Sequence, residues 1–175
     1  TGTDRLSEVV DILQLPDEAM LINVQGDEPF IPPELINLVA KALHDSPSAA
    51  IATVGVPLSH EADIQNPNIV KIVHNHLGEA LYFSRQTIPF LRGIEKSAWL
   101  ASHVFFKHIG LYAYRADVLK KLSQLKPSPL EVAESLEQLR WLENGYVIQT
   151  IETQYETVGI DSPADLEKIK KMGLV

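Results

Sequence analysis

Short apolar runs alternate along the chain with segments in which apolar residues recur every three or four positions. The runs at 20–24, 49–56 and 147–151 have the length of buried strands, whereas helical spacing marks 3–13 and 31–43. Strands without a polar face are covered on both sides, as in parallel sheets, and helices between the strands supply that cover. The sequence therefore predicts an α/β fold of three layers with a mostly parallel sheet.

A second pair of apolar runs predicts an antiparallel hairpin inserted into this sheet. The runs are 69–73 and 80–84, and the residues between them include Asn75 and Gly78, which favour turn conformations. A further strand is predicted at 108–114.

Helix-terminal residues mark the last third of the chain. Ser128 suits an N-cap, Pro129 the first helical position and Glu131 the far side of a capping box, while Gly145 stands where helices commonly end. We therefore predict one helix between Ser128 and Gly145, preceded by a shorter helix at 116–125.

Several aromatic and imidazole side chains have a structural interpretation. The stretch 90–106 has weak periodicity and hydrophobic residues that look exposed, so it is predicted to be a mobile loop or a contact surface. Its aromatic residues are predicted to serve packing or dimer contacts, not base stacking: Trp99, Phe105 and Phe106. His74 and His76 share one face of the hairpin without a nearby acidic companion in the sequence, and we predict that both are exposed.

Charge and cysteine content limit the partners and the location. The 23 acidic and 15 basic residues give a net charge of −8, and the basic ones are scattered, which argues against nucleic acid but permits a small phosphorylated ligand. Cysteine is absent, so that a metal would need oxygen or imidazole ligands. No apolar run approaches the roughly 20 residues of a membrane span. We predict a soluble, cytoplasmic protein.

Two acidic motifs stand at element boundaries. The motif N-V-Q-G-D-E-P at 23–29 follows a predicted strand, at the end where open α/β sheets bind ligands. Gln25 can donate and accept hydrogen bonds at a base edge, and Asp27 can ligate a hard cation. The motif V-G-I-D-S-P at 158–163 places Asp161 before the last predicted helix. Each motif alone also fits a simple turn, but converging Asp27 and Asp161 would suit Mg²⁺ bound to phosphate.

Seven segments in order, running nearly end to end, resemble the 3-deoxy-manno-octulosonate cytidylyltransferases, or CMP-Kdo synthetases. They are G-T-D-R-L at 2–6, N-V-Q-G-D-E-P at 23–29, A-L-Y-F-S-R at 80–85, H-I-G-L-Y at 108–112, S-P-L-E at 128–131, L-E-Q-L-R at 136–140 and G-I-D-S-P at 159–163. The resemblance implies a Rossmann-like nucleotidyltransferase and a homodimer. Its members transfer a cytidylyl group from CTP to 3-deoxy-D-manno-octulosonate (Kdo), releasing pyrophosphate and forming CMP-Kdo for lipopolysaccharide biosynthesis.

The same resemblance implies residue roles. Asp27 and Asp161 would be catalytic and would hold Mg²⁺, whereas Arg5 and Gln25 would lie near the cytidine. Six residues would face the sugar acid: Arg85, Arg92, His108, Tyr112, Glu137 and Gln138. Guanidinium groups bind carboxylate or phosphate in two-pronged fashion, and the other side chains suit a ligand rich in hydroxyls.

Three interpretations stay open on the sequence. The family normally begins with a strand and a phosphate-gripping loop of the form G-x-R-x-x-S-x-R-x-x-G-K, which this sequence lacks. We therefore expect 1–175 to be a single nucleotidyltransferase domain that is incomplete at its N-terminal side. The chain is then part of a Kdo cytidylyltransferase, an enzyme for another acidic sugar such as an acylneuraminate, or a non-catalytic nucleotide-binding or interaction subunit.

Overall fold

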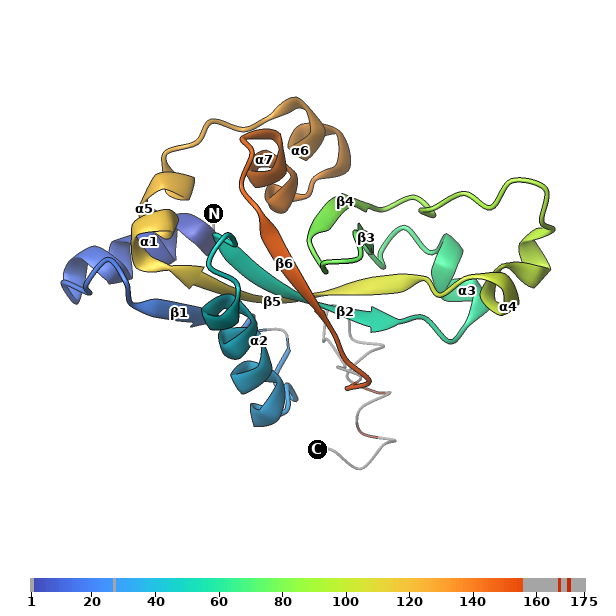
Figure 1. Cartoon of the computed structure of the whole chain (residues 1–175), viewed down its shortest axis with the longest axis horizontal. Helices are drawn as coiled ribbons and strands as arrows, with labels where there is room; N and C mark the ends of the chain where they lie inside the picture. The colour runs from blue at the N-terminus through green and yellow to red at the C-terminus, as the bar shows by residue number, and fades with distance from the viewer. Residues whose placement is uncertain (1, 27, 156–166, 168–169, 171–175) are drawn as a thin grey trace.

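The computed structural model describes residues 2–26, 28–155, 167 and 170 (Figure 1). Helices and strands follow in the order α1 Gly2–Ile12, β1 Met20–Asn23, α2 Pro33–Asp45, β2 Ile51–Pro57, α3 Glu61–Gln65, β3 Lys71–His74, β4 Ala80–Ser84, the 3₁₀ helix η1 Lys96–Ala98, α4 Trp99–Ser102, β5 Phe106–Arg115, α5 Ala116–Ser123, α6 Pro129–Glu134, α7 Glu137–Glu143 and β6 Ile148–Glu152. The predicted α/β class is confirmed. Within these residues, no helix combines the length and apolar content that crossing a membrane requires.

A six-stranded sheet runs through the middle of the molecule, with the long strand β5 at its centre (Figure 1). The strand order is β4-β3-β5-β2-β6. One edge of β5 pairs with β2 along most of its length. The other edge pairs with β3 at Phe106 and Lys107 and with β1 from Tyr112 to Arg115. The centre of the sheet is thus a single strand that contacts three others.

The expectation of a mostly parallel sheet was wrong for the described residues. Only β2 and β6 are parallel neighbours, because β5 runs antiparallel to β1, β2 and β3. A continuous apolar run predicts that both faces of a strand are covered, but it does not predict whether the strand runs parallel or antiparallel to its neighbours. The predicted antiparallel hairpin is confirmed as β3 and β4.

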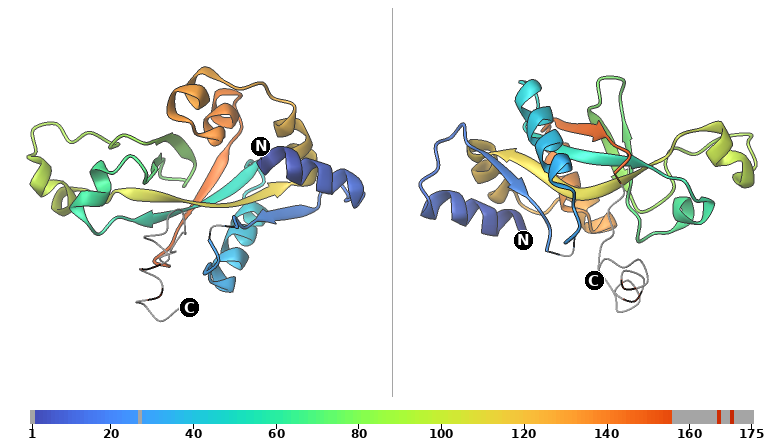
Figure 2. Two further views of the ribbon diagram at one scale, coloured as in Figure 1. Left: turned by 180° about the vertical axis from the view of Figure 1, so that it is seen from behind. Right: turned by 90° about the horizontal axis from the view of Figure 1, so that it is seen from below.

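Helices cover both faces of the sheet, so the predicted three layers are confirmed (Figure 2, right). On one face α2 buries Leu35, Val39 and Leu43 completely, against Ile109, Leu111 and Ala113 of β5. A fully buried leucine contributes about 2 kcal/mol through apolar transfer. On the opposite face Tyr112 and Tyr114 pack among residues of α1, α5 and α7. The alternation along β5 therefore sends even-numbered residues toward α7.

The predicted helix between Ser128 and Gly145 is two helices. Its start is as predicted: Ser128 Oγ accepts from the Glu131 N–H at 3.4 Å, and Glu131 Oε2 accepts from the Ser128 N–H at 3.1 Å. However, Ser135 has a φ of 54° and a ψ of 49°, which ends α6. Left-handed backbone in a residue other than glycine requires support from its surroundings.

The support comes from β4, far away in the sequence. The Glu134 carboxylate accepts hydrogen bonds from Ser84 Oγ at 2.6 Å and from the Arg85 N–H at 2.9 Å. These bonds fix the end of α6 against the sheet, and the following Leu136 is buried in the core. Because the break depends on tertiary contacts, the local helix signals did not reveal it.

The stretch 90–106 contains η1 and α4, and it has its own small core. Trp99 is 3% exposed and Phe105 is 1% exposed, with their rings stacked at a centroid distance of 5.9 Å. Leu58 and Ile64 complete the cluster. The packing role predicted for Trp99 and Phe105 is confirmed, and the exposed appearance of Trp99 in the sequence was misleading because α4 turns it inward.

Candidate functional site

A cleft of about 290 Å³, lined by both polar and apolar side chains, opens between β5, the residues that follow β1, and α7. Its lining is Gly2, Thr3, Asn23, Gln25, Val70, His108, Gly110, Tyr112, Tyr114, Leu136, Glu137, Gln138 and Trp141. Five of the predicted site residues are among them: Gln25, His108, Tyr112, Glu137 and Gln138. Three segments that are distant in the sequence therefore bring predicted site residues to one cleft.

A bulge in β5 shapes the floor of the cleft. Tyr112 pairs with Thr53 of β2, but Ile109 already pairs with the next residue of β2, so two residues of β5 bulge out. One of them is Gly110, and the nearest atom to a side chain built there would be Cγ of Gln25 at 3.5 Å. Bulges commonly redirect side chains beside functional sites. Here the bulge lies between His108 and Tyr112, which both line the cleft.

Helix α7 supplies the opposite wall. Glu137, Gln138 and Trp141 all line the cleft, and Gln138 and Trp141 are 7% and 2% exposed. Sequence reasoning did not single out Trp141. The available signal was its position four residues after Glu137, which places both on one side of a helix.

Three buried polar atoms of the cleft lack a hydrogen-bond partner among the described residues. They are the Tyr112 hydroxyl, Glu137 Oε1 and Trp141 Nε1. Glu137 Oε1 lies 3.9 Å from Arg140 Nη2, which is an ion-pair distance longer than a hydrogen bond. Each buried polar atom without a partner costs about 1–3 kcal/mol. The arrangement suits a ligand that offers several oxygen atoms and hydroxyl groups.

Burial sets the protonation states of the strand residues. It lowers the pKa of His108 to about 3. Burial, followed by the nearby Glu137 carboxylate, raises the pKa of Tyr112 well above its ordinary value. At neutral pH His108 is therefore neutral and Tyr112 keeps its proton. Both side chains can exchange hydrogen bonds with a ligand, but neither contributes a charge.

We expect His108→Gln to reduce the acid sensitivity of the fold. The folded-state pKa of His108 lies below the unfolded value of about 6.5, so the unfolded chain binds the extra proton as pH falls, and stability is lost from about pH 6.5 downward. Between pH 7 and pH 5 this group alone removes about 2 kcal/mol.

Urea unfolding at the two pH values measures the effect. The variant should lose about 2 kcal/mol less than the wild type over this interval. His76→Gln, at an exposed position of the hairpin turn, is the matched control for the substitution itself and should change stability at pH 7 by less than about 0.5 kcal/mol. Equal losses in His108→Gln and wild type would contradict the burial of a neutral imidazole.

The predicted arginines lie outside the lining of this cleft. Arg85 donates from Nε to the Glu134 carbonyl at 2.8 Å, from Nη1 to the Pro67 carbonyl at 3.1 Å and from Nη2 to the Ser135 carbonyl at 3.4 Å. Its guanidinium therefore stabilises the end of α6 by hydrogen bonds to backbone carbonyls. Arg5 is exposed on α1, and Arg92 is exposed between β4 and η1. Substrate contacts of these three arginines stay predictions.

The two predicted metal ligands, Asp27 and Asp161, lie outside the described residues. Gln25, two positions before Asp27, lines the cleft, and a side chain at Gly26 would meet no atom of the described residues within 4 Å. Among the described residues, none crowds the backbone at Gly26. Among the described side chains, no group of three or more histidine, aspartate or glutamate residues is arranged to hold a metal ion.

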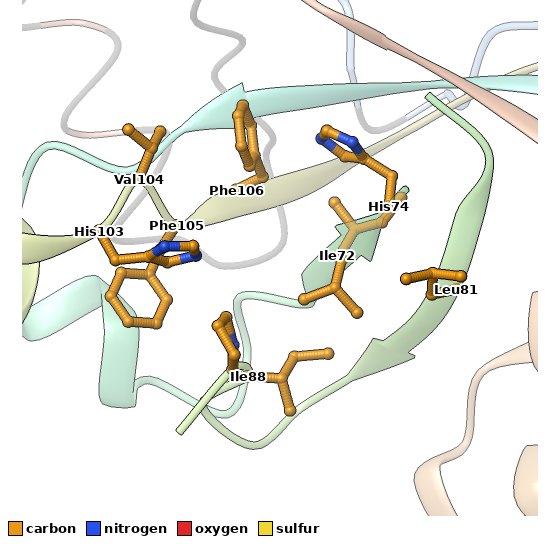
Figure 3. A pocket seen from close by; sticks show the side chains of 10 residues that line it. Ile72, His74, Leu81, Ile88, His103, Val104, Phe105 and Phe106 are labelled. Atoms are coloured by element: carbon orange, nitrogen blue, oxygen red, sulfur yellow. The ribbon is translucent and has the colours of Figure 1, made fainter. Parts of the chain in front are cut away.

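A second, apolar cleft of about 400 Å³ lies beside the hairpin (Figure 3). Aliphatic and aromatic side chains form most of its walls, with His74 and His103 as the polar members. The prediction for His74 was wrong: it packs on Phe106 at a ring distance of 5.0 Å, and its Nε2 lies 3.5 Å from Glu152 Oε1. The acidic partner comes from β6, which the hairpin sequence does not reveal. The exposure of His76 is confirmed.

Comparison with known proteins gives consistent matches. A family model described as cytidylyltransferase matches residues 1–169. A 3-deoxy-manno-octulosonate cytidylyltransferase of Cytophaga hutchinsonii is 55% identical over 170 residues, which are 97% of this chain and 67% of that protein. The enzyme of that name from Parabacteroides distasonis is 50% identical over 172 residues, covering 96% of this chain and 68% of the relative. The chain thus spans about two thirds of these relatives.

Solved structures agree with this result. The structure of a CMP:2-keto-3-deoxy-manno-octonic acid synthetase complexed with CTP matches with a TM-score of 0.87 and 40% identity, over 99% of this chain and 68% of that one. A putative glucose-1-phosphate thymidylyltransferase from Bacillus anthracis matches with a TM-score of 0.58 at 12% identity, over 97% of this chain and 59% of that one, and this similarity concerns the fold alone. The predicted Rossmann-like nucleotidyltransferase fold is confirmed.

Proposed function

Because the chain belongs to the 3-deoxy-manno-octulosonate cytidylyltransferase family, we propose that it transfers a cytidylyl group from CTP to Kdo, forming CMP-Kdo and pyrophosphate. One structural observation supports the assignment of this activity to specific residues. The cleft between β5 and α7 gathers five residues predicted from the sequence, and three of its buried polar atoms have no hydrogen-bond partner among the described residues. A sugar acid rich in hydroxyls offers the groups that these atoms lack.

We assign different parts of the cleft to the two substrates. We place the sugar acid between β5 and α7, where His108, Tyr112, Glu137 and Gln138 supply hydrogen-bonding groups. Gln25, just beyond β1, would contact the nucleotide, because its amide can donate and accept at a base edge. Asp27 and Asp161 would hold Mg²⁺, which supplies charge neutralisation on the phosphates when it is bound.

The reaction that we propose is an in-line displacement. The oxygen of the anomeric hydroxyl of Kdo forms a bond to the α-phosphorus of CTP, the bond from that phosphorus to the bridging oxygen breaks, and pyrophosphate leaves. The hydroxyl proton passes to solvent. His108 is neutral at the working pH and holds the sugar by hydrogen bonding, since burial keeps its pKa too low for it to carry a proton. The residues of the cleft thus orient the nucleophile, and no covalent enzyme intermediate is needed.

Two further parts of the proposal concern the cell. We expect the protein to act in the cytoplasm, and we expect a homodimer because the family resemblance implies one. Neither nucleic acid nor a membrane is required by the reaction.

The direct test is pyrophosphate release by the full-length protein with CTP, Mg²⁺ and a sugar acid. We expect turnover with Kdo and much slower turnover with N-acetylneuraminate. Calorimetric binding of each sugar acid is measured in parallel. Faster turnover with N-acetylneuraminate would favour the alternative substrate, and binding of CTP without turnover on any sugar acid would favour a non-catalytic subunit.

A single hydroxyl tests the placement of the sugar acid. Tyr112→Phe removes only a hydroxyl of the cleft lining, so we expect KM for Kdo to rise about fivefold, the loss of one neutral hydrogen bond. Tyr82→Phe is the matched control, because Tyr82 lies on β4 outside the cleft lining. Equal kinetics in the two variants would contradict this placement.

A further inference from the structure

Thr53 is a fully buried residue of β2 whose hydroxyl contacts His108. We propose that Thr53 is a positioning residue that fixes the tautomer of His108, with the proton on Nε2 and with Nδ1 as an acceptor for a substrate hydroxyl. The inference deepens the proposed function and rests on it for the identity of the substrate. No sequence motif singled out Thr53.

The hydrogen-bond geometry assigns the protons. Thr53 Oγ1 lies 2.9 Å from the Leu111 carbonyl oxygen, 3.4 Å from the Ile109 carbonyl oxygen and 3.0 Å from His108 Nε2. A hydroxyl has one proton, and carbonyl oxygens only accept. Both short contacts are satisfied at once only if the hydroxyl donates to Leu111 and accepts from an Nε2–H group. The other tautomer would leave one of these contacts without a proton.

The fold holds this arrangement in place. The β5 bulge brings the Leu111 carbonyl to Thr53, which pairs with Tyr112 across the strands. The His108 ring is held between the edge of Phe83, at a centroid distance of 5.0 Å, and the ring of Tyr112, at 5.2 Å. The low pKa of His108 also keeps the ring neutral, so that a tautomer is defined at all.

The tautomer decides which substrate group His108 can contact. Nδ1 has no hydrogen-bond partner among the described residues, and the ring lines the cleft. As an acceptor, Nδ1 pairs with a hydroxyl and is repelled by a carboxylate, which also only accepts. His108 then recognises a hydroxyl of the sugar acid, and it opposes binding of the sugar with its carboxylate at that position. A site built to hydrogen-bond a hydroxyl discriminates strongly against ligands that lack it.

The test combines a spectroscopic and a kinetic measurement. Long-range ¹H–¹⁵N correlation spectra of the full-length protein, with His108 assigned from the spectrum of His108→Gln, report the tautomer directly. We expect Nε2–H in the wild type and in Thr53→Ser, and a shift toward Nδ1–H in Thr53→Val, which keeps the shape of threonine but has no hydroxyl. KM for Kdo should rise about tenfold in Thr53→Val, recover in Thr53→Ser, and leave KM for CTP unchanged in both.

The outcomes distinguish the positioning role of Thr53 from the proposed function of the protein. An Nδ1–H tautomer in the wild type would overturn the inference even if Thr53→Val fails to fold, and so would a wild-type tautomer in a folded Thr53→Val. An Nε2–H tautomer that depends on the threonine hydroxyl, in a protein that turns over no sugar acid, would support the positioning role and overturn the proposed function.

Discussion

Replacing Glu131 by alanine should lower the free energy of unfolding by about 3–5 kcal/mol, the cost of leaving a buried charge without its partner. Arg140 is 4% exposed, and its Nε and Nη2 donate to the two carboxylate oxygens of Glu131, with an Nε–Oε2 distance of 2.7 Å. The Arg140 hydrogen bond also lowers the pKa of Glu131. The same carboxylate caps α6 through the Ser128 N–H. The substitution therefore removes an ion pair and a helix cap together.

The pH dependence of this contribution has a definite sign. Because the folded-state pKa of Glu131 lies below the unfolded value, the stabilisation is present above the unfolded pKa of about 4.3 and is lost as pH falls through the lower folded value. The difference in free energy of unfolding between wild type and Glu131→Ala should therefore become smaller as the pH falls below about 4.3.

Chemical unfolding at neutral pH measures the loss. Glu8→Ala, at an exposed position of α1, is the matched control and should change stability by less than about 0.5 kcal/mol. Since Arg140 lies on α7 beside Glu137 and Gln138, Glu131→Ala should also weaken binding of the sugar acid. A loss of stability below about 1 kcal/mol would contradict the view that this ion pair fixes α7 against α6.

The sequence predicted the features that depend on local chemistry. The capping box at Ser128 and Glu131 formed as expected, because its two hydrogen bonds join residues three apart. The end of the same helix was not predictable in this way. It depends on contacts of Glu134 with Ser84 and Arg85, about 50 positions earlier in the chain.

The direction of β5 shows a second limit. A strand was correctly predicted at 108–114, and it lies within β5. The direction in which such a strand runs follows from the path of the chain through η1 and α4, where periodicity is weak. The sequence therefore supported the layers of the fold and the inserted hairpin, but not the antiparallel pairing at the centre of the sheet.

In the candidate site too, residues on one element were predictable from the sequence, whereas contacts between elements were not. His108 and Tyr112 were predicted to share a face from their even spacing on a strand, and both line the cleft. Thr53 contacts His108 across strands that are 55 positions apart, so no local pattern could link them. The family resemblance implied that Arg85 faces the sugar acid, a role that suits arginine because it binds anions. In the structure its guanidinium donates hydrogen bonds to three backbone carbonyls. Spacing along one element was informative, whereas partners across elements required coordinates.

We expect Asp27→Asn to fold normally and to lose 100-fold or more in turnover, comparable to removal of one electrostatic stabiliser from an active site. Asparagine keeps the size of aspartate but lacks its negative charge, and hard cations such as Mg²⁺ require charged oxygen ligands. Asp27 lies two positions after Gln25, a residue of the cleft lining, so loss of its charge should affect the site directly.

The measurement is kcat for pyrophosphate release at saturating CTP, Kdo and Mg²⁺, together with thermal unfolding of each protein. Asp17→Asn removes a charge from an exposed side chain, whose contact is with Lys120 at 3.4 Å, and should stay within about twofold of the wild type because exposed ion pairs contribute little. If Asp27→Asn unfolds like the wild type and releases pyrophosphate at a similar rate, Asp27 is not a metal ligand of this reaction. A large loss in Asp27→Asn alone, at unchanged stability, would instead place the metal and the phosphates at the end of β1, beside the cleft that we assign to the sugar acid.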